Sequence, residues 1–412
     1  MANTILTNSM ITNEALMVAK SQIGELKKRM NVGYATNFAK SGHKIGDTLN
    51  VRLPGQFTVG DGESMTPQDH EQKSVSIQVN SQKHIGLQFG DQERTLKLDN
   101  FRELVLEPAV TALVETAMSE VMKASYKQIA NFAGIPHATN LPNSTAPFGS
   151  ARAKLLSLGA PTSKLSAAID PFVEDSLAQG SQSLFNPNAA ISKQYLDNEI
   201  TRAAGLDFLM SQVVPKHTIG ALGGTPLTNG STADGATSVV TDGWTAAASN
   251  RLKAGDVIQL AGVYAVHPQT KESTGKLRDF VVTADVASDG SGNATIPISP
   301  AIIASGPYQN VSNVPADGSA ITTFGHASSY AGVTAPQSLV FHKSAIALCV
   351  VPLEKIAGQN MTVATDDETG LSVRFWEDGN ITSGKAIKRL DILFGSKVVR
   401  PEFAARVVGR LS

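Results

Sequence analysis

"RLKAGDVIQLAGVYAVHPQTKESTGKLRDFVVTAD" (Arg251–Asp285) divides into short apolar runs separated by glycines and charged residues. The runs predict strands at Val257–Leu260, Val263–Val266 and Arg278–Ala284, and a further strand follows at Ala294–Ile298. Short strands at regular spacing, with glycine turns between them, are typical of a small barrel or sandwich. This stretch therefore predicts a compact all-β module.

The flanking sequence indicates that the module is an insertion. Residues 217–250 contain no Lys or Arg and only two acids, Asp234 and Asp242, and Gly, Thr, Ser and Ala dominate. From Pro336 onward, longer apolar strands return in "QSLVFHKSAIALCVVPL". We therefore expect residues 218–333 to be an all-β domain inserted into an α+β domain, which makes the whole chain α+β.

The longest helical pattern lies upstream, in "LDNFRELVLEPAVTALVETAMSEVMKASYKQIANFAG" (Leu98–Gly134). Apolar residues recur at helical spacing, Asp99 can cap the start, and Gly134 can end the helix. Pro108 predicts either a kink or the true start. A helix of this length spans on the order of 40 Å, which suits a structural strut.

The N-terminal region predicts a basic, amphipathic arm. Residues 13–31 carry apolar side chains at helical spacing, with Asn13 as the expected cap. From Glu14 to Arg52 there are seven basic residues and three acidic ones. Lys27, Lys28 and Arg29 are candidates for contact with an acidic partner or DNA, and a solvated helix face is the alternative.

Two alternating stretches predict a β-projection. "GDTLNVRLPGQFTVGDG" (Gly46–Gly62) and "KSVSIQVNSQKHIGLQFG" (Lys73–Gly90) have the period of strands. A lone hairpin is marginal in water, so we expect the projection to lie on another subunit. Arg52, on its outgoing strand, is a candidate assembly contact.

"WEDGNITSGKAIKRLD" (Trp376–Asp391) comes close to a phosphate-binding loop, with Gly379, Gly384 and Lys385 at nearly the required spacing. Ala386 stands where the magnesium-binding Ser or Thr belongs, and only 27 residues follow Lys385. That leaves no room for the later acidic strand of such an enzyme. We interpret the stretch as a turn between two strands, with Lys385 and Lys388 as candidates for intersubunit pairing.

Composition narrows the remaining functions. Basic and acidic residues nearly balance, 35 against 36, so no global charge points to nucleic acid or a membrane. One cysteine, Cys349, excludes a disulfide framework, and the eight histidines show no metal-ligand spacing. We predict no enzyme activity, cofactor, metal or membrane span, and the N-terminus has no signal-peptide pattern. A secreted or surface β-rich adhesin remains the alternative, although it does not explain the long helix.

The ordered set of elements resembles the major capsid (coat) proteins of tailed double-stranded-DNA bacteriophages, which share the Hong Kong 97 fold. The phage P-twenty-two branch, whose coat protein carries an inserted domain, is most similar. The resemblance rests on Gly46–Gly62, on Arg251–Asp285, and on "LDILFGSKVVRPEFAARVV" (Leu390–Val408) with its Gly-x-x-x-x-Arg-Pro-Glu turn. It extends along essentially the whole chain, although the low-charge 217–250 stretch departs from the charged intercapsomer loop that the resemblance leads one to expect.

The resemblance implies a subunit that forms pentamers and hexamers of an icosahedral shell in the host bacterial cytoplasm. Implied partners are a scaffolding protein, a portal protein and packaged double-stranded DNA, without a membrane. The implied parts, in chain order, are an N-terminal arm, an extended β-loop, a peripheral domain with the spine helix, two axial-domain segments around the inserted β domain, and closing strands. The expected bounds are 1–45 for the arm, 46–92 for the extended loop and 93–146 for the peripheral domain. The axial segments are expected at 147–217 and 334–386, the inserted domain at 218–333 and the closing strands at 387–412.

Overall fold

The structure of the chain is a computed structural model, and it divides into two compact units. The first unit holds Met1–Val51, Val75–Val121 and Ile346–Lys397, and the second holds Arg52–Ser74, Met122–Ala345 and Val398–Ser412. The residues it describes are 8–32, 48–59, 63, 67, 72–90, 102–181, 202–246, 250–325, 330–356, 358–366, 370–380 and 385–411.

The first unit is built on a five-stranded sheet. Its strands are β3 (Ser81–Gly90), β17 (Ile346–Val350), β18 (Asn360–Asp366), β19 (Leu371–Asn380) and β20 (Lys385–Val398). The path runs β17-β20-β19-β18, and β3 also pairs with β20, from Lys385↔Gly90 to Phe394↔Ser81. The 14-residue β20 is therefore the strand that holds the sheet together.

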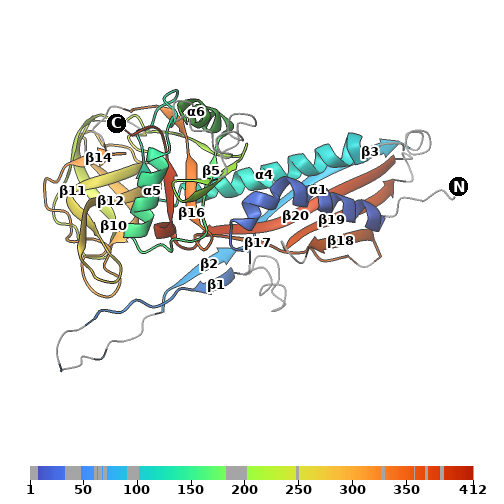
Figure 1. Ribbon diagram of the computed structural model, residues 1–412, viewed down its shortest axis with the longest axis horizontal. Coiled ribbons are helices and arrows are strands. Elements are labelled where there is room, and N and C mark those ends of the chain that lie inside the picture. The colour runs from blue at the N-terminus through green and yellow to red at the C-terminus, as the bar shows by residue number, and fades with distance from the viewer. Residues whose placement is uncertain are drawn as a thin grey trace. The chain divides into compact units, whose positions relative to one another are not determined.

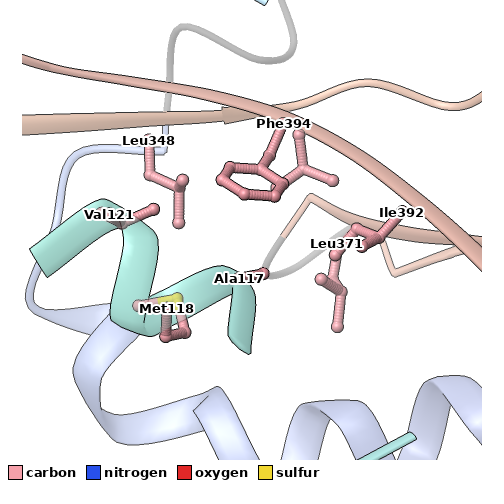
Figure 2. Close-up of a pocket in the computed structure, with 8 residues that line it drawn as sticks. Ala117, Met118, Val121, Leu348, Leu371, Ile392 and Phe394 are labelled. Carbon is pink, nitrogen blue, oxygen red and sulfur yellow. The ribbon is translucent and has the colours of Figure 1, made fainter. Parts of the chain in front are cut away.

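Two helices cover one face of this sheet (Figure 1). They are α1 (Asn8–Lys28) and α4 (Glu107–Tyr126), the latter directly preceded by a π-helical turn, Arg102–Leu106. A small hollow with a volume of about 10 Å³, partly open to solvent, lies between α4 and the sheet (Figure 2). Its lining is apolar throughout and comprises Ala117, Met118, Val121, Leu348, Val350, Leu371, Ile392 and Phe394.

Both helices differ in length from the sequence prediction. The α-helix α4 begins at Glu107, so Pro108 marks its start and does not kink it, because proline fits the first helical turn. It ends at Tyr126, and Gly134 lies beyond it, after the short strand β4 (Phe132–Ala133). Helix α1 begins at Asn8, so Asn13 is an interior residue and was wrongly predicted as the cap. The predicted cap Asp99 lies outside the described residues.

Among the residues of the predicted β-projection that the structure describes, strand pairing is found at its two ends. Strand β1 (Thr48–Arg52) pairs with β2 (Ser74–Gln78) in a two-stranded sheet. The second alternating stretch then breaks at Val79–Asn80, and its remainder is β3 in the five-stranded sheet. The alternating pattern predicted strands correctly, but it did not reveal that the two halves of this stretch have different partners.

The second unit contains a six-stranded sheet and a partly closed, barrel-like domain. The sheet order is β4-β21-β16-β5-β7-β6, with helices α5 (Ala146–Ser157) and α6 (Pro171–Ser181) beside it. Its strands besides β4 are β5 (Leu165–Ile169), β6 (Arg202–Ala203), β7 (Leu206–Met210), β16 (Ser338–His342) and β21 (Ala404–Val407). All five residues of the central β5 are buried, as expected for an apolar strand inside a sheet.

The inserted domain is a six-stranded sheet that partly closes on itself. The order is β14-β11-β12-β13-β10-β9, and the end strands meet through a bridge between Leu227 and Ala320. The strands are β9 (Gly224–Thr228), β10 (Ala236–Trp244), β11 (Val257–Val266), β12 (Ser273–Val282), β13 (Ala294–Ile302) and β14 (Ile321–Thr323). The interior is filled by fully buried side chains such as Phe280, Ile258 and Ile296.

One detail of the barrel corrects the sequence prediction. Residues 257–260 and 263–266 form a single strand, β11, whose pairing with β12 shifts register between Gln259 and Tyr264. Gly262, with φ of +81°, lies in that irregular stretch. A glycine with positive φ can form a bulge as well as a turn, and here it bends a continuous strand.

Candidate assembly elements

The basic cluster Lys27, Lys28 and Arg29 lies at the C-terminal end of α1. The helix ends at Lys28, and the Arg29 amide donates to the Leu26 carbonyl at 3.2 Å. Leu26 and Met30, on either side of the cluster, are buried. Cations at a helix C-terminus are stabilised by the helix dipole.

The chain directly after this cluster is joined to the sheet of the first unit. The Asn31 amide donates to the Ile346 carbonyl at 2.9 Å, and the Leu348 amide donates to the Asn31 carbonyl at 3.1 Å. The basic end of the arm is therefore fixed to β17 and not left as a free tail. The sequence predicted the helix but not this attachment.

The extended β-loop places apolar side chains in solvent. Phe57 is 58% exposed and Val59 is 84% exposed, in the segment that follows β1. Arg52, the last residue of β1, is exposed as well. A two-stranded ribbon has no core of its own, and exposed apolar residues in the chain that continues it are typical of an interaction surface.

Lys385 and Lys388 lie on β20, in the stretch Trp376–Asp391 that comes close to a phosphate-binding loop. Strands β19 and β20 are antiparallel, with Asn380 opposite Lys385, so the chain after Lys385 is a strand and not the helix of a nucleotide site. The interpretation as a turn between two strands is confirmed. The Lys388 Nζ atom lies 3.8 Å from Glu377 Oε1, and its side chain is only 8% exposed. Lys388 thus faces its own hairpin more than solvent.

A buried carboxylate that sequence reasoning missed joins three strands of this sheet. Asp391 is fully buried and accepts from Arg374 Nη2 at 2.7 Å and Nε at 3.1 Å, and from Arg389 Nε at 2.7 Å. Gln82 Nε2, on β3, donates to it at 3.3 Å. The alternation of Arg389 and Asp391 is visible in the sequence, but their partners on β19 and β3 follow only from strand register.

The described part of the chain offers little for cofactor chemistry. Within it, no group of three His, Cys, Asp or Glu residues is arranged to hold a metal ion. Cys349 is buried with no exposed surface. No described helix combines the length and apolar character that crossing a bilayer requires.

A sheet held together by buried charges, a covering helix and a loop with exposed apolar residues suit a structural subunit that packs against other chains. The family comparison agrees: a sequence model described as P22 coat protein - gene protein 5 matches residues 67–409. The chain belongs to the P22 coat protein family. It is a shell-forming major capsid protein of a bacteriophage, a component of the virion, with the tailed-phage capsid fold.

Several solved structures are similar to the chain at low sequence identity. One from Mycobacterium phage Che8 has 11% identity and a TM-score of 0.46, covering 92% of this chain and 89% of its own. The capsid of cyanophage P-SCSP1u has 12% identity and a TM-score of 0.44, covering 90% and 85%. The CUS-3 coat protein I-domain has 28% identity and a TM-score of 0.19, covering 26% of this chain and 98% of its own. Among curated proteins, none matches the chain.

Proposed function

We propose that copies of this chain form pentamers and hexamers that close into an icosahedral shell around double-stranded phage DNA. Assembly takes place in the host bacterial cytoplasm, directed by a scaffolding protein, and a portal protein joins the shell. The family match over residues 67–409 carries this proposal. The role is structural and not enzymatic, and the arm, extended loop, peripheral, axial and inserted parts keep the bounds expected from the sequence.

The shell itself is tested by size and shape. The chain is purified alone and with its phage's scaffolding protein, and is examined by sedimentation and negative-stain electron microscopy. Closed particles of uniform diameter are expected. Small species under every condition, with scaffolding protein present, would contradict the proposal.

The extended loop is the proposed contact between neighbouring copies. Phe57 and Val59 become buried against the next subunit, which supplies the core that a two-stranded ribbon lacks. The double variant Phe57→Ser/Val59→Ser should keep the circular dichroism and melting temperature of the subunit but form no shells. Val240→Ser is the matched control, because Val240 is 51% exposed on the barrel. Shell formation by the loop variant at the normal yield would contradict this contact.

The basic end of α1 is the proposed contact with acidic scaffolding protein or DNA. The variant Lys27→Glu/Lys28→Glu/Arg29→Glu should reduce assembly yield, with a defect that depends on salt because salt screens the attraction between charges. Sedimentation at 0.05 M and 0.5 M salt measures it. Equal yields of variant and parent at both salt concentrations would remove this role.

A further inference from the structure

The inserted barrel joins the rest of the second unit through a narrow two-stranded connector. Strand β8 (Lys216–Thr218) leads into the barrel, and β15 (Thr334–Pro336) leads out, with His217 opposite Ala335. Their threonines, Thr218 and Thr334, are joined by a hydrogen bond of 2.8 Å between the hydroxyl oxygens. A connector of two three-residue strands is too short to fix the orientation of a domain by itself.

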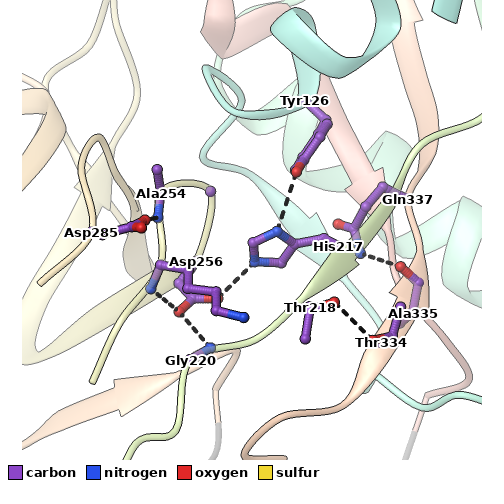
Figure 3. Close-up of polar contacts among 12 residues, drawn as sticks. Tyr126, His217, Thr218, Gly220, Ala254, Asp256, Asp285, Thr334, Ala335 and Gln337 are labelled. Atoms are coloured by element: carbon purple, nitrogen blue, oxygen red, sulfur yellow. Dashed lines mark hydrogen bonds and ion pairs between the residues drawn. The ribbon is translucent and has the colours of Figure 1, made fainter. Parts of the chain in front are cut away.

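One buried carboxylate beside this connector joins the incoming chain, from His217 to Gly220, to the barrel loop that carries the carboxylate itself (Figure 3). Asp256 is fully buried, and its Oδ1 atom lies 2.7 Å from Nε2 of His217 on β8. Its Oδ2 atom accepts the amide of Gly220, where the chain enters the barrel, at 3.1 Å, and the amide of Lys253 at 2.8 Å. Asp256 therefore links the incoming strand of the connector, and the chain that follows it, to a loop of the barrel.

His217 is also held from the other side. Its Nδ1 atom lies 3.3 Å from the hydroxyl of Tyr126, the last residue of α4. Burial raises the pKa of Tyr126, and the charge of Asp256 adds to this, while the Arg406 charge opposes it, so the hydroxyl keeps its proton. Arg406, on β21, donates to the carbonyl of Gly255 at 2.8 Å, directly beside Asp256.

Groups of both charge signs lie near His217. Asp256 and Tyr126 contact its two different ring nitrogens, and the guanidinium carbon of Arg406 lies 5.8 Å from the centre of the Tyr126 ring. A carboxylate accepts a hydrogen bond from Nε2–H whether His217 is neutral or protonated. The Tyr126 hydroxyl can donate to Nδ1 or accept from it. The native pair is thus satisfied in both protonation states.

We propose that Asp256 and His217 are positioning residues that fix the inserted barrel on the subunit body, and that only a carboxylate at position 256 does so independently of pH. An amide at this position can donate to His217 Nε2 while the imidazole is neutral, with Nδ1–H then turned toward Tyr126. It cannot do so once Nε2 carries a proton, because two donors then face each other. The consequence for shell shape rests on the proposed function, whereas the effect on the free subunit does not.

Hydrogen exchange of the free subunit tests the pair. Protection factors of peptides containing Gly220 and Lys253 are measured at pH 8 and pH 5.5. Asp256→Asn should match the parent at pH 8 and lose at least about tenfold in protection at pH 5.5, as expected for loss of a charge-assisted hydrogen bond. Equal protection of variant and parent at both pH values, or an equal loss at both, would overturn the proposal.

Two further variants separate the histidine from general damage. In the double variant Asp256→Asn/His217→Gln, which has no imidazole to protonate, the difference between pH 8 and pH 5.5 should disappear. Its persistence would overturn the role of His217. Asp289→Asn is the matched control in the same barrel, because Asp289 accepts the amides of Ser291 and Asn293, both at 2.8 Å, with no histidine among its contacts.

If Asp256→Asn does not fold, two substitutions of His217 test the same contact. His217→Gln keeps a donor toward Asp256, and His217→Leu removes it. The first should retain parental protection at Gly220 and Lys253, and the second should lose it. Identical behaviour of the two would overturn the proposal.

Assembly gives the final comparison. Shells of Asp256→Asn should be closed at pH 8 and irregular at pH 5.5, while parental shells are closed at both, and closed variant shells at pH 5.5 would overturn the link to shell shape. If the parent forms no shells, the proposed function fails, and the exchange experiment still decides the role of Asp256.

Discussion

Two buried arginines, one in each unit, are held in different ways. In the first unit, Arg374 makes a two-point ion pair with Asp391 and donates from Nη1 to the Glu354 carbonyl at 3.3 Å. In the second, Arg406 lies between the rings of Tyr126 and Phe324, at 5.8 and 5.7 Å. Its Nη1 atom donates to Gly255 and Gln337, but Nε and Nη2 have no hydrogen-bond partner among the described residues.

The electrostatic consequence follows from that difference. Burial lowers the pKa of Arg406 to about 10, although Tyr126, Asp256 and Asp279 oppose the change. A buried charge with a good partner is costly to disturb, whereas one held mainly by packing can be replaced by an apolar side chain at little cost. In the first unit, the ion pair with Asp391 therefore stabilises the buried Arg374. In the second unit, the buried charge of Arg406 is poorly compensated, and packing between two rings holds the side chain.

The largest effect is expected where Asp391 is removed. Asp391→Ala leaves Arg374 and Arg389 without their buried acceptor, so we expect a loss of about 3–5 kcal/mol in the free energy of unfolding. Urea denaturation followed by circular dichroism measures it. Asp378→Ala, at an exposed position on the same hairpin, is the control and should change little. A loss below about 1 kcal/mol would mean that Asp391 does not hold the sheet together.

The two arginines can be compared directly by the same substitution. Arg374→Met should lose about 2–3 kcal/mol, because Asp391 keeps only part of its hydrogen bonding. Arg406→Met should change stability by less than about 1 kcal/mol, since methionine fills the space between the rings without a buried charge. Denaturation of both variants at pH 7 is the measurement. The opposite order would reverse the comparison.

Glu402, a charged residue of the second unit, makes stability depend on pH. Burial raises the pKa of Glu402, and the charges of Arg400 and Arg278 only partly oppose this. The folded state therefore binds the proton more tightly, so stability falls as pH rises from the ordinary value of 4.5 through the folded pKa.

Glu402→Gln should remove this decline. At pH 7 the variant is expected to be more stable than the parent by on the order of 1 kcal/mol, and near pH 4 the two should be equal. Thermal melts across this range measure the difference. A variant that is less stable at pH 7 would show that the carboxylate is well paired.

The smallest effect concerns the hollow under α4. Ala117→Val adds two methyl groups to the apolar lining and should raise the free energy of unfolding by a few tenths of a kcal/mol, up to about 1. Ala112→Val, at an exposed position on the same helix, reports the cost of a β-branched residue alone, roughly 0.5 kcal/mol. If the two variants behave alike, the hollow is too tight to fill.

The spacing of apolar residues along the chain predicted the type of secondary structure, because that depends mainly on neighbouring residues. Alternation predicted the strands of the barrel, and helical spacing predicted the helix that buries Val110, Val114 and Val121. The pairing of residues 81–90 with β20, some 300 positions later, was not predicted because register between distant strands leaves no local signal.

The same limit applied to the functional contacts. Asp391 needs Gln82 and Arg374 beside it, and Asp256 needs His217, which lies 39 positions earlier. Each of these residues is unremarkable in its own stretch of sequence. The basic cluster at Lys27, by contrast, is visible because its members are adjacent, and its role remains a prediction.

The bridge between Leu227 and Ala320 has a further consequence. A strand at the edge of an open sheet offers unpaired amides and carbonyls to any passing chain, and this invites aggregation. Many copies of a coat protein are packed into one particle, where an open edge would lie close to the same edge on neighbouring copies. Because the bridge between Leu227 and Ala320 pairs the two ends of the barrel sheet, the inserted domain offers less open strand edge for pairing with a neighbouring copy.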